Sequence, residues 1–167
     1  MDESMKLPFA QSRLHRAMLA VCLSSSLLLP ITARANDAVQ AQSPWFRYLL
    51  PTTPAGGYVT LRNTSGSPSV LTGADSPACG SIMLHRTESS GGVERMIGVS
   101  SITVPPHGTF AFSPGGYHIM CIQPKMHAGE RVPVTLNFAD GSQVSASFVV
   151  RAANASAGGA MPMKMSQ

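Results

Sequence analysis

The alternation of apolar and polar residues near the end of the chain constrains the fold most. In the runs 131–138 and 143–150, every second residue is apolar. A period of two with one apolar face is typical of a half-buried β-strand. The dipeptide Asp140-Gly141 separates the two runs, and Asp-Gly is a strong hairpin signal. This segment is therefore predicted to be an antiparallel β-hairpin.

Eight further short runs have a similar character, and each is bounded by Gly, Pro, Asn or Ser. The 15 Gly and 13 Pro of the chain favour many short strands over long helices. No segment shows a convincing 3.6-residue period, and Ser90-Gly91-Gly92 predicts a second tight turn. We therefore predict an all-β fold, an antiparallel sandwich or barrel, with strands at 45–50, 57–62, 69–73, 81–87, 93–98, 101–104, 109–112, 116–122, 131–138 and 143–150.

Residues 1–35 are predicted to be a secretory signal peptide. Basic residues precede an apolar run at 17–29, which is too short for a comfortable membrane span. Ala33-Arg34-Ala35 then matches the small-x-small pattern of a cleavage site, placed after Ala35. No Cys follows the apolar run directly, so no lipid or membrane anchor is expected after cleavage. The alternative is an uncleaved N-terminal anchor.

The rest of the chain divides into three predicted parts. Residues 36–44 are a polar, flexible leader, 45–151 form the β-domain, and 152–167 are a disordered, Met-containing tail. The predicted location is the periplasm. The formal net charge is +4, but there is no basic run interleaved with aromatics, so nucleic-acid binding is not expected. Nothing indicates an obligate dimer, and a monomer is expected.

Two of the three cysteines, Cys79 and Cys121, lie in the predicted domain, whereas Cys22 lies in the predicted signal peptide. In an oxidising compartment an even pair of cysteines is most simply a disulfide. The alternative is that one thiolate binds a metal ion.

Histidine and methionine residues gather on three of the predicted strands. Met83 and His85 are two residues apart and share a face of one strand, as do His118 and Met120 on another, and Met96 lies between them in sequence. Alone, a strand His is usually solvated and a strand Met usually packs in the core. Together, thioethers and imidazoles favour Cu(I) over hard cations. Without a carboxylate or an obligatory thiolate, zinc is a weaker fit.

The spacing His85…Met96…His118-Ile119-Met120 matches the copper-binding signature of the periplasmic PCu(A)C copper chaperone family. The surrounding segments resemble that family too. They are Ala55-Gly56-Gly57-Tyr58-Val59-Thr60-Leu61-Arg62-Asn63, Leu84-His85-Arg86-Thr87, Pro114-Gly115-Gly116-Tyr117-His118-Ile119-Met120 and Gly129-Glu130-Arg131-Val132-Pro133-Val134-Thr135-Leu136. The resemblance covers about residues 45–150. Cys121, directly after the His-x-Met, departs from the family pattern.

The resemblance implies a cupredoxin-like β-sandwich that is not an enzyme and binds one Cu(I) at an exposed rim through His85, Met96, His118 and Met120. It implies delivery of copper to the copper subunit of cytochrome c oxidase, directly or through a thioredoxin-like assembly factor. The tail resembles the Met-rich extensions of some members, so Met161, Met163 and Met165 are candidate auxiliary ligands.

Two other functions stay open at this point. A blue-copper electron-transfer site needs a thiolate with two His and a weak axial Met, and no His follows Cys121 at a suitable spacing. A purely structural or catalytic β-domain is the other alternative. His107 and His127 lie on predicted turns, outside the pattern, and are expected to be solvated.

Overall fold

The computed structural model describes residues 34–153 of the chain. In this range every regular element is a strand, which confirms the all-β prediction, and no helix there is long and apolar enough to cross a membrane. The strands are β1 (Arg34–Ala35), β2 (Val39–Tyr48), β3 (Ala55–Asn63), β4 (Ser69–Asp75), β5 (Ser81–Ser90), β6 (Val93–Gly98), β7 (Ile102–Val104), β8 (Thr109–Ala111), β9 (Tyr117–Ile122), β10 (Arg131–Phe138) and β11 (Ser142–Ala152).

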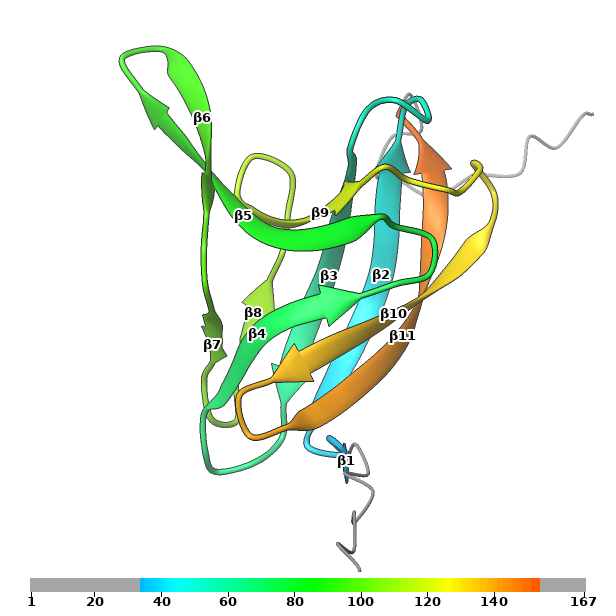
Figure 1. Ribbon diagram of the computed structural model, residues 1–167. Coiled ribbons are helices and arrows are strands. Elements are labelled where there is room, and N and C mark those ends of the chain that lie inside the picture. The colour runs from blue at the N-terminus through cyan, green and yellow to red at the C-terminus, as the bar shows by residue number, and fades with distance from the viewer. Residues whose placement is uncertain (1–33, 154–167) are drawn as a thin grey trace, which may run out of the picture. The chain divides into compact units, whose positions relative to one another are not determined.

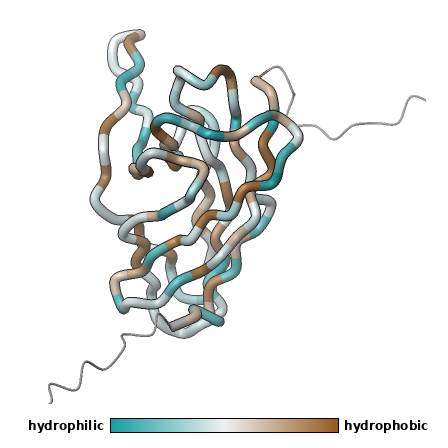
Figure 2. The backbone as a smooth tube through the Cα atoms, turned by 45° about the vertical axis from the view of Figure 1, so that its right-hand side comes forward, coloured by the Kyte–Doolittle hydropathy of each residue, from teal (hydrophilic) through white to brown (hydrophobic). Residues whose placement is uncertain are grey.

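One continuous, strongly curled sheet connects these strands. Its order is β6-β5-β9-β3-β2-β11-β10-β4-β7, with β1 added to β11 and β8 added to β3. In Figure 1, β4 and β10 cross in front of β2 and β3, so that the sheet folds back over itself in two layers. β4 also contacts β5, which brings distant parts of the sheet together. The β5–β6 hairpin projects away from the body (Figure 2).

The predicted hairpin near the end of the chain is confirmed. β10 pairs antiparallel with β11, and Gly141 in the turn has φ of 78°, a conformation that glycine adopts without strain. The alternate apolar side chains of both strands point into the core, and Leu136 and Phe148 among them are fully buried. Phe148 packs against Phe46 of β2, with ring centroids 4.9 Å apart, at the centre of the core.

Strand β2 corrects the prediction of a flexible leader over residues 36–44. Val39 to Gln42 pair in register with β3, and Val39 is buried. The register shifts between Gln42 and Trp45, where Ser43 has φ of 49°. Ser43 and Pro44 thus form a bulge inside one strand and do not mark the start of the domain. A bulge, like a turn, places such residues between apolar ones.

The other end predictions fall largely outside the described residues. Of the predicted signal peptide, 1–35, only Arg34 and Ala35 are described, and they pair in parallel with Ser142 and Gln143 as β1. The predicted tail, 152–167, is described only at its first two residues, 152 and 153, so Met161, Met163 and Met165 lie outside the described residues.

Candidate metal centre

Strand register brings the predicted site residues together on one face. In the antiparallel pair β5–β9, His85 lies directly opposite His118, and Met83 lies directly opposite Met120. Met96 lies on the neighbouring strand β6, opposite Thr87. Because alternate residues of a strand share a face, the two histidines and all three methionines are on the same side of this three-stranded segment.

The opposite face of the same strands packs in the core, and this is what fixes the orientation of the site. Leu84, Ile119 and Cys121 are buried between the histidine and methionine positions. A one-residue slip would exchange the two faces and bury the imidazoles in the core in place of these apolar groups. The sequence predicted this division of β5 and β9 correctly.

The site changes from buried to exposed across its width. His118 and Met120 are buried, whereas Met96 is 64% exposed. A hollow of about 270 Å³, which we call the Met96 hollow, opens between β9 and the loop that joins β2 to β3. Its lining includes Leu49, Thr53, Tyr58, Met96, His118 and Met120. The inner candidate donors, His118 and Met120, are therefore held by packing, and the outer candidate donor, Met96, is accessible to another molecule.

Each of the two imidazoles has a buried nitrogen that lacks a hydrogen-bond partner within residues 34–153. His118 Nδ1 lies 3.1 Å from the carbonyl oxygen of Gly116. A carbonyl only accepts, so Nδ1 carries the hydrogen and Nε2 keeps its lone pair in the neutral ring. Among the described residues, neither His118 Nε2 nor His85 Nδ1 has a hydrogen-bond partner. The rings stand edge to face, with centroids 5.8 Å apart.

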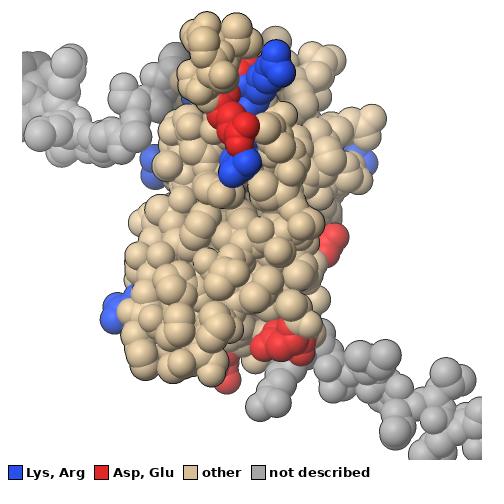
Figure 3. Space-filling model, turned by 90° about the vertical axis from the view of Figure 1, so that its left-hand side faces the viewer, with Lys and Arg blue, Asp and Glu red and all other residues tan. Residues whose placement is uncertain are grey.

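Electrostatics favour a neutral imidazole at His85. Burial, and secondly the neighbouring His118, lower the pKa of His85 below its ordinary value. Arg47 of β2 and Glu94 of β6 also line the Met96 hollow. On the projecting hairpin, Arg86 forms an ion pair with Glu88. Figure 3 shows acidic and basic side chains together at that end of the molecule and a largely uncharged face beside them. Within residues 34–153, no three His, Cys, Asp or Glu side chains cluster in a way that could hold a metal ion.

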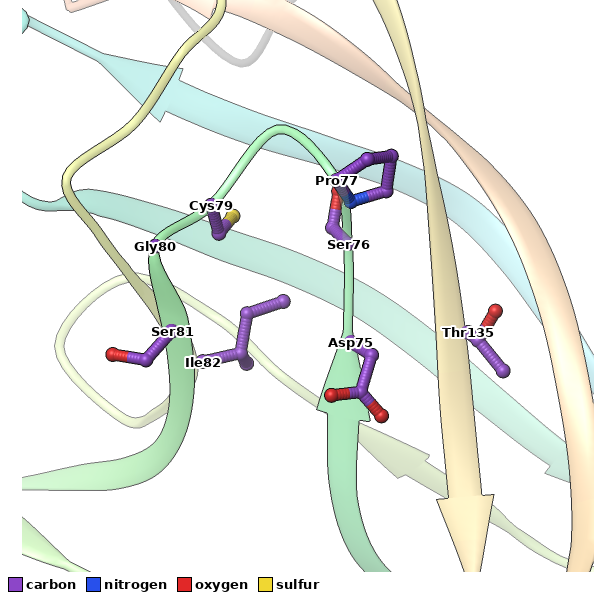
Figure 4. A pocket seen from close by; sticks show the side chains of 8 residues that line it. All are labelled: Asp75, Ser76, Pro77, Cys79, Gly80, Ser81, Ile82 and Thr135. Carbon is purple, nitrogen blue, oxygen red and sulfur yellow. The ribbon is translucent and has the colours of Figure 1, made fainter.

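Cys79 and Cys121 are joined by a disulfide, with their Cα atoms 5.4 Å apart. It links the turn after β4 to β9, one residue beyond Met120. Figure 4 shows Cys79 in this turn, beside a hollow of about 210 Å³ that Asp75 and Thr135 also line. Paired sulfur atoms offer no thiolate to a metal. The disulfide therefore removes the thiolate that zinc binding or a blue-copper centre would use.

The remaining described histidines do not join the site. His107 and His127 are both exposed, as predicted. His127 Nδ1 lies 3.1 Å from a carboxylate oxygen of Glu130. Two side chains near the site are additional to the predicted ligand set, Met83 and Tyr58. The two-residue spacing of Met83 from His85 was the sequence signal for the first. The hydroxyl of Tyr58 lies over Gly56, which pairs with Met120 in the strand register.

Known proteins resemble this chain in sequence and in fold. A protein of Leifsonia xyli subsp. xyli, "Putative lipoprotein Lxx21020", is 34% identical over 131 residues, which cover 74% of each chain. Among solved structures, the copper-bound PCuAC domain from PmoF2 has a TM-score of 0.59 and 25% identity, over 73% of this chain and 99% of that one. The Cu(I) form of DR1885 from Deinococcus radiodurans has a TM-score of 0.50 and 30% identity, over 77% and 83%.

These likenesses bear on the predicted fold and family. The PCuAC domain from PmoF2 and the Cu(I) form of DR1885 share the fold of this chain, in agreement with the cupredoxin-like fold predicted from the sequence. The family described as "Putative lipoprotein LpqE-like" matches residues 39–150, which begin at β2 and end within β11. The match spans nearly the whole described domain, and the chain is a member of this LpqE-like family.

Proposed function

We propose that the protein is an exported copper chaperone that binds one Cu(I) through His85, Met96, His118 and Met120. One observation carries this proposal: two adjacent imidazoles each keep a buried nitrogen without a partner among the described residues, beside thioethers on the same face. Leaving a buried polar atom unpaired costs about 1–3 kcal/mol. A metal ion shared by both lone pairs would offset that cost.

The donor set suits Cu(I) in particular. Thioether sulfur is soft and imidazole is a good copper ligand, whereas Mg²⁺, Ca²⁺ and Mn²⁺ prefer oxygen donors. All four donors are neutral, so the bound ion would keep a single positive charge and bind less tightly than at a thiolate site. Moderate binding with one exposed ligand, Met96, suits a carrier, which has to release its cargo.

The likeness to copper-bound PCuAC domains supports the same function. We propose that the acceptor is the copper subunit of cytochrome c oxidase, reached directly or through a thioredoxin-like assembly factor. We propose a periplasmic location, in keeping with the predicted signal peptide and with the lipoprotein names of the family and its relative. In this function copper is cargo, and no reaction is catalysed.

The test is a titration with Cu(I) against a chromophoric Cu(I) chelator. The protein should take up one equivalent tightly, and the His118→Gln/Met120→Leu variant should lose that equivalent. Both replacements keep the approximate size of the side chain, so the apo-variant should retain the β-sheet circular dichroism and melt near the wild-type temperature.

The matched control is His127→Gln, which changes an exposed histidine outside the site and should leave copper binding unchanged. Equal binding by wild type and by His118→Gln/Met120→Leu would contradict the proposed ligands. A Met161→Leu/Met163→Leu/Met165→Leu variant then locates any second equivalent of copper, because it should lose only the equivalent that the tail holds.

A further inference from the structure

We propose that Met83 is an exchange ligand: a thioether that takes copper transiently from the inner donors while the ion passes to an acceptor with soft sulfur or nitrogen donors. This inference rests on the proposed function and adds a fifth donor to the site. It assigns Met83 a kinetic role, in the transfer of copper, rather than a place in the resting coordination sphere.

The strand register places Met83 close to the inner donors. It lies directly opposite Met120, and it precedes His85 by two residues on the same face. Directly opposed side chains in an antiparallel pair have Cβ atoms about 4.5–5.5 Å apart. A methionine side chain is unbranched and has three rotatable bonds, so its sulfur can move over that range without any backbone change.

Met83 lies outside the buried core. Its side chain is 44% exposed, whereas Leu84 beside it in the same strand is buried in the core. Methionine usually serves to fill irregular gaps in a core. The thioether is exposed on the same face as two imidazole nitrogens that have no hydrogen-bond partner in the described part of the chain, and metal chemistry explains this more readily than packing does.

Met83 and Met96 line two different hollows beside the imidazole pair, which distinguishes the role of Met83 from that of Met96. The Met96 hollow is lined by Met96, His118 and Met120. A second hollow of about 380 Å³, the Met83 hollow, opens between β4 and β5 and is lined by Met83, His85 and Gly98. The two hollows share no lining residue. Copper held between the imidazoles would therefore border on two open spaces, each with one exposed methionine.

The transfer step is a ligand exchange without redox chemistry. A Met83 sulfur–copper bond forms as the bond from copper to Met120 or to an imidazole breaks, and copper stays Cu(I). The acceptor's lone pair then replaces the remaining protein donors one at a time. Each ligand that leaves keeps its own electron pair, and no free ion is formed.

The experiment measures the rate and the equilibrium of transfer separately. Cu(I)-loaded wild type and Met83→Leu are mixed in a stopped-flow instrument with excess bicinchoninate, and the absorbance of its Cu(I) complex is followed. An exchange ligand lowers the barrier to transfer without changing its end states, so Met83→Leu should slow transfer to bicinchoninate by about fivefold and leave the affinity in the chelator competition unchanged. X-ray absorption should give the same number of copper–sulfur bonds in both resting proteins.

A Met83→Leu/Ile97→Met double variant is the matched control. Residue 97 is an exposed position on the other face of β6, so a thioether there restores the methionine count without restoring the exchange ligand. This variant should transfer copper as slowly as Met83→Leu. Rapid transfer by it would overturn the proposal, because any exposed thioether would then suffice.

Three other outcomes would also overturn the proposal. Unchanged rates in Met83→Leu would show that Met83 takes no part in transfer. Weaker affinity and one fewer copper–sulfur bond would make it a resident ligand. Failure of wild type to bind copper would refute the proposed function together with this inference, whereas normal wild-type binding with unchanged rates would refute this inference alone.

Discussion

The disulfide between Cys79 and Cys121 permits a quantitative prediction. Replacing both cysteines by alanine in a Cys79→Ala/Cys121→Ala variant removes a cross-link between residues 42 apart in the chain. In the chain-entropy description, closing a loop of that length stabilises the folded state by about 4 kcal/mol, because it reduces the freedom of the unfolded chain. The variant should lose about that much of its free energy of unfolding.

The assay is urea and thermal unfolding of the apo-protein, followed by circular dichroism. For a domain of this size, a loss of about 4 kcal/mol corresponds to a fall in Tm of roughly 15 °C. Wild type treated with a reductant is the control, and it should unfold close to the variant. A loss below about 1 kcal/mol would refute the reasoning, since the unfolded chain would then have to be constrained without the cross-link.

Copper binding by the same variant tests the separation of the disulfide from the site. Neither sulfur belongs to the proposed ligand set, and the register of β5 with β9 positions the histidines without it. At a temperature where the variant is folded, it should still bind one Cu(I) with wild-type affinity in the chelator competition. A large loss of affinity in the folded variant would show that the cross-link itself shapes the site.

Three further predictions concern the site and the strand beneath it. The free energy of unfolding of the apo-protein should fall as the pH drops from about 6.5 through the lowered folded-state pKa of His85, because the unfolded chain binds that proton more readily. Urea titrations at about pH 7.5 and pH 5 measure this change. The His85→Gln variant should show a weaker pH dependence. Gly57→Ala should cost about 1–3 kcal/mol in the same assay, because a Cβ there would lie 2.6 Å from the Phe46 ring, whereas Gly73→Ala, with open space around it, should cost far less. Met96→Leu should change the free energy of unfolding by less than about 0.5 kcal/mol, because the side chain is exposed, yet weaken Cu(I) in the chelator competition.

Most of the strands could be predicted from the sequence because each one carries its own alternation. Every predicted range overlaps a strand of the structure. The predicted start of the first long strand was wrong, because turn-favouring residues interrupt the alternation of apolar and polar residues there. In β2, Val39 and Ala41 face inward, but Ser43 and Pro44 interrupt the pattern, and only the hydrogen-bonded partner strand shows that the interruption is a bulge.

The shared face of the candidate site residues was predictable from the sequence, and their burial was not. The spacing of His118 and Met120 places both on one face of a strand, whatever the rest of the fold does. Their burial depends on the distant loop between β2 and β3, which a local pattern does not reveal. Met83 illustrates the same limit, since its role depends on lying opposite Met120 across two strands that are far apart in sequence.

The sequence by itself determined the all-β class, most strand positions, the inward faces and the placement of His and Met side chains on shared strand faces, because these follow from local periodicity. The tertiary structure alone decided that His85 faces His118, that two imidazole nitrogens are left without a partner among the described residues, and that separate hollows open beside Met83 and Met96. The physical reason is that strand pairing is non-local. Residues as far apart in the chain as His85 and His118 meet only when the whole sheet buries its apolar faces at once, and no short segment contains that information.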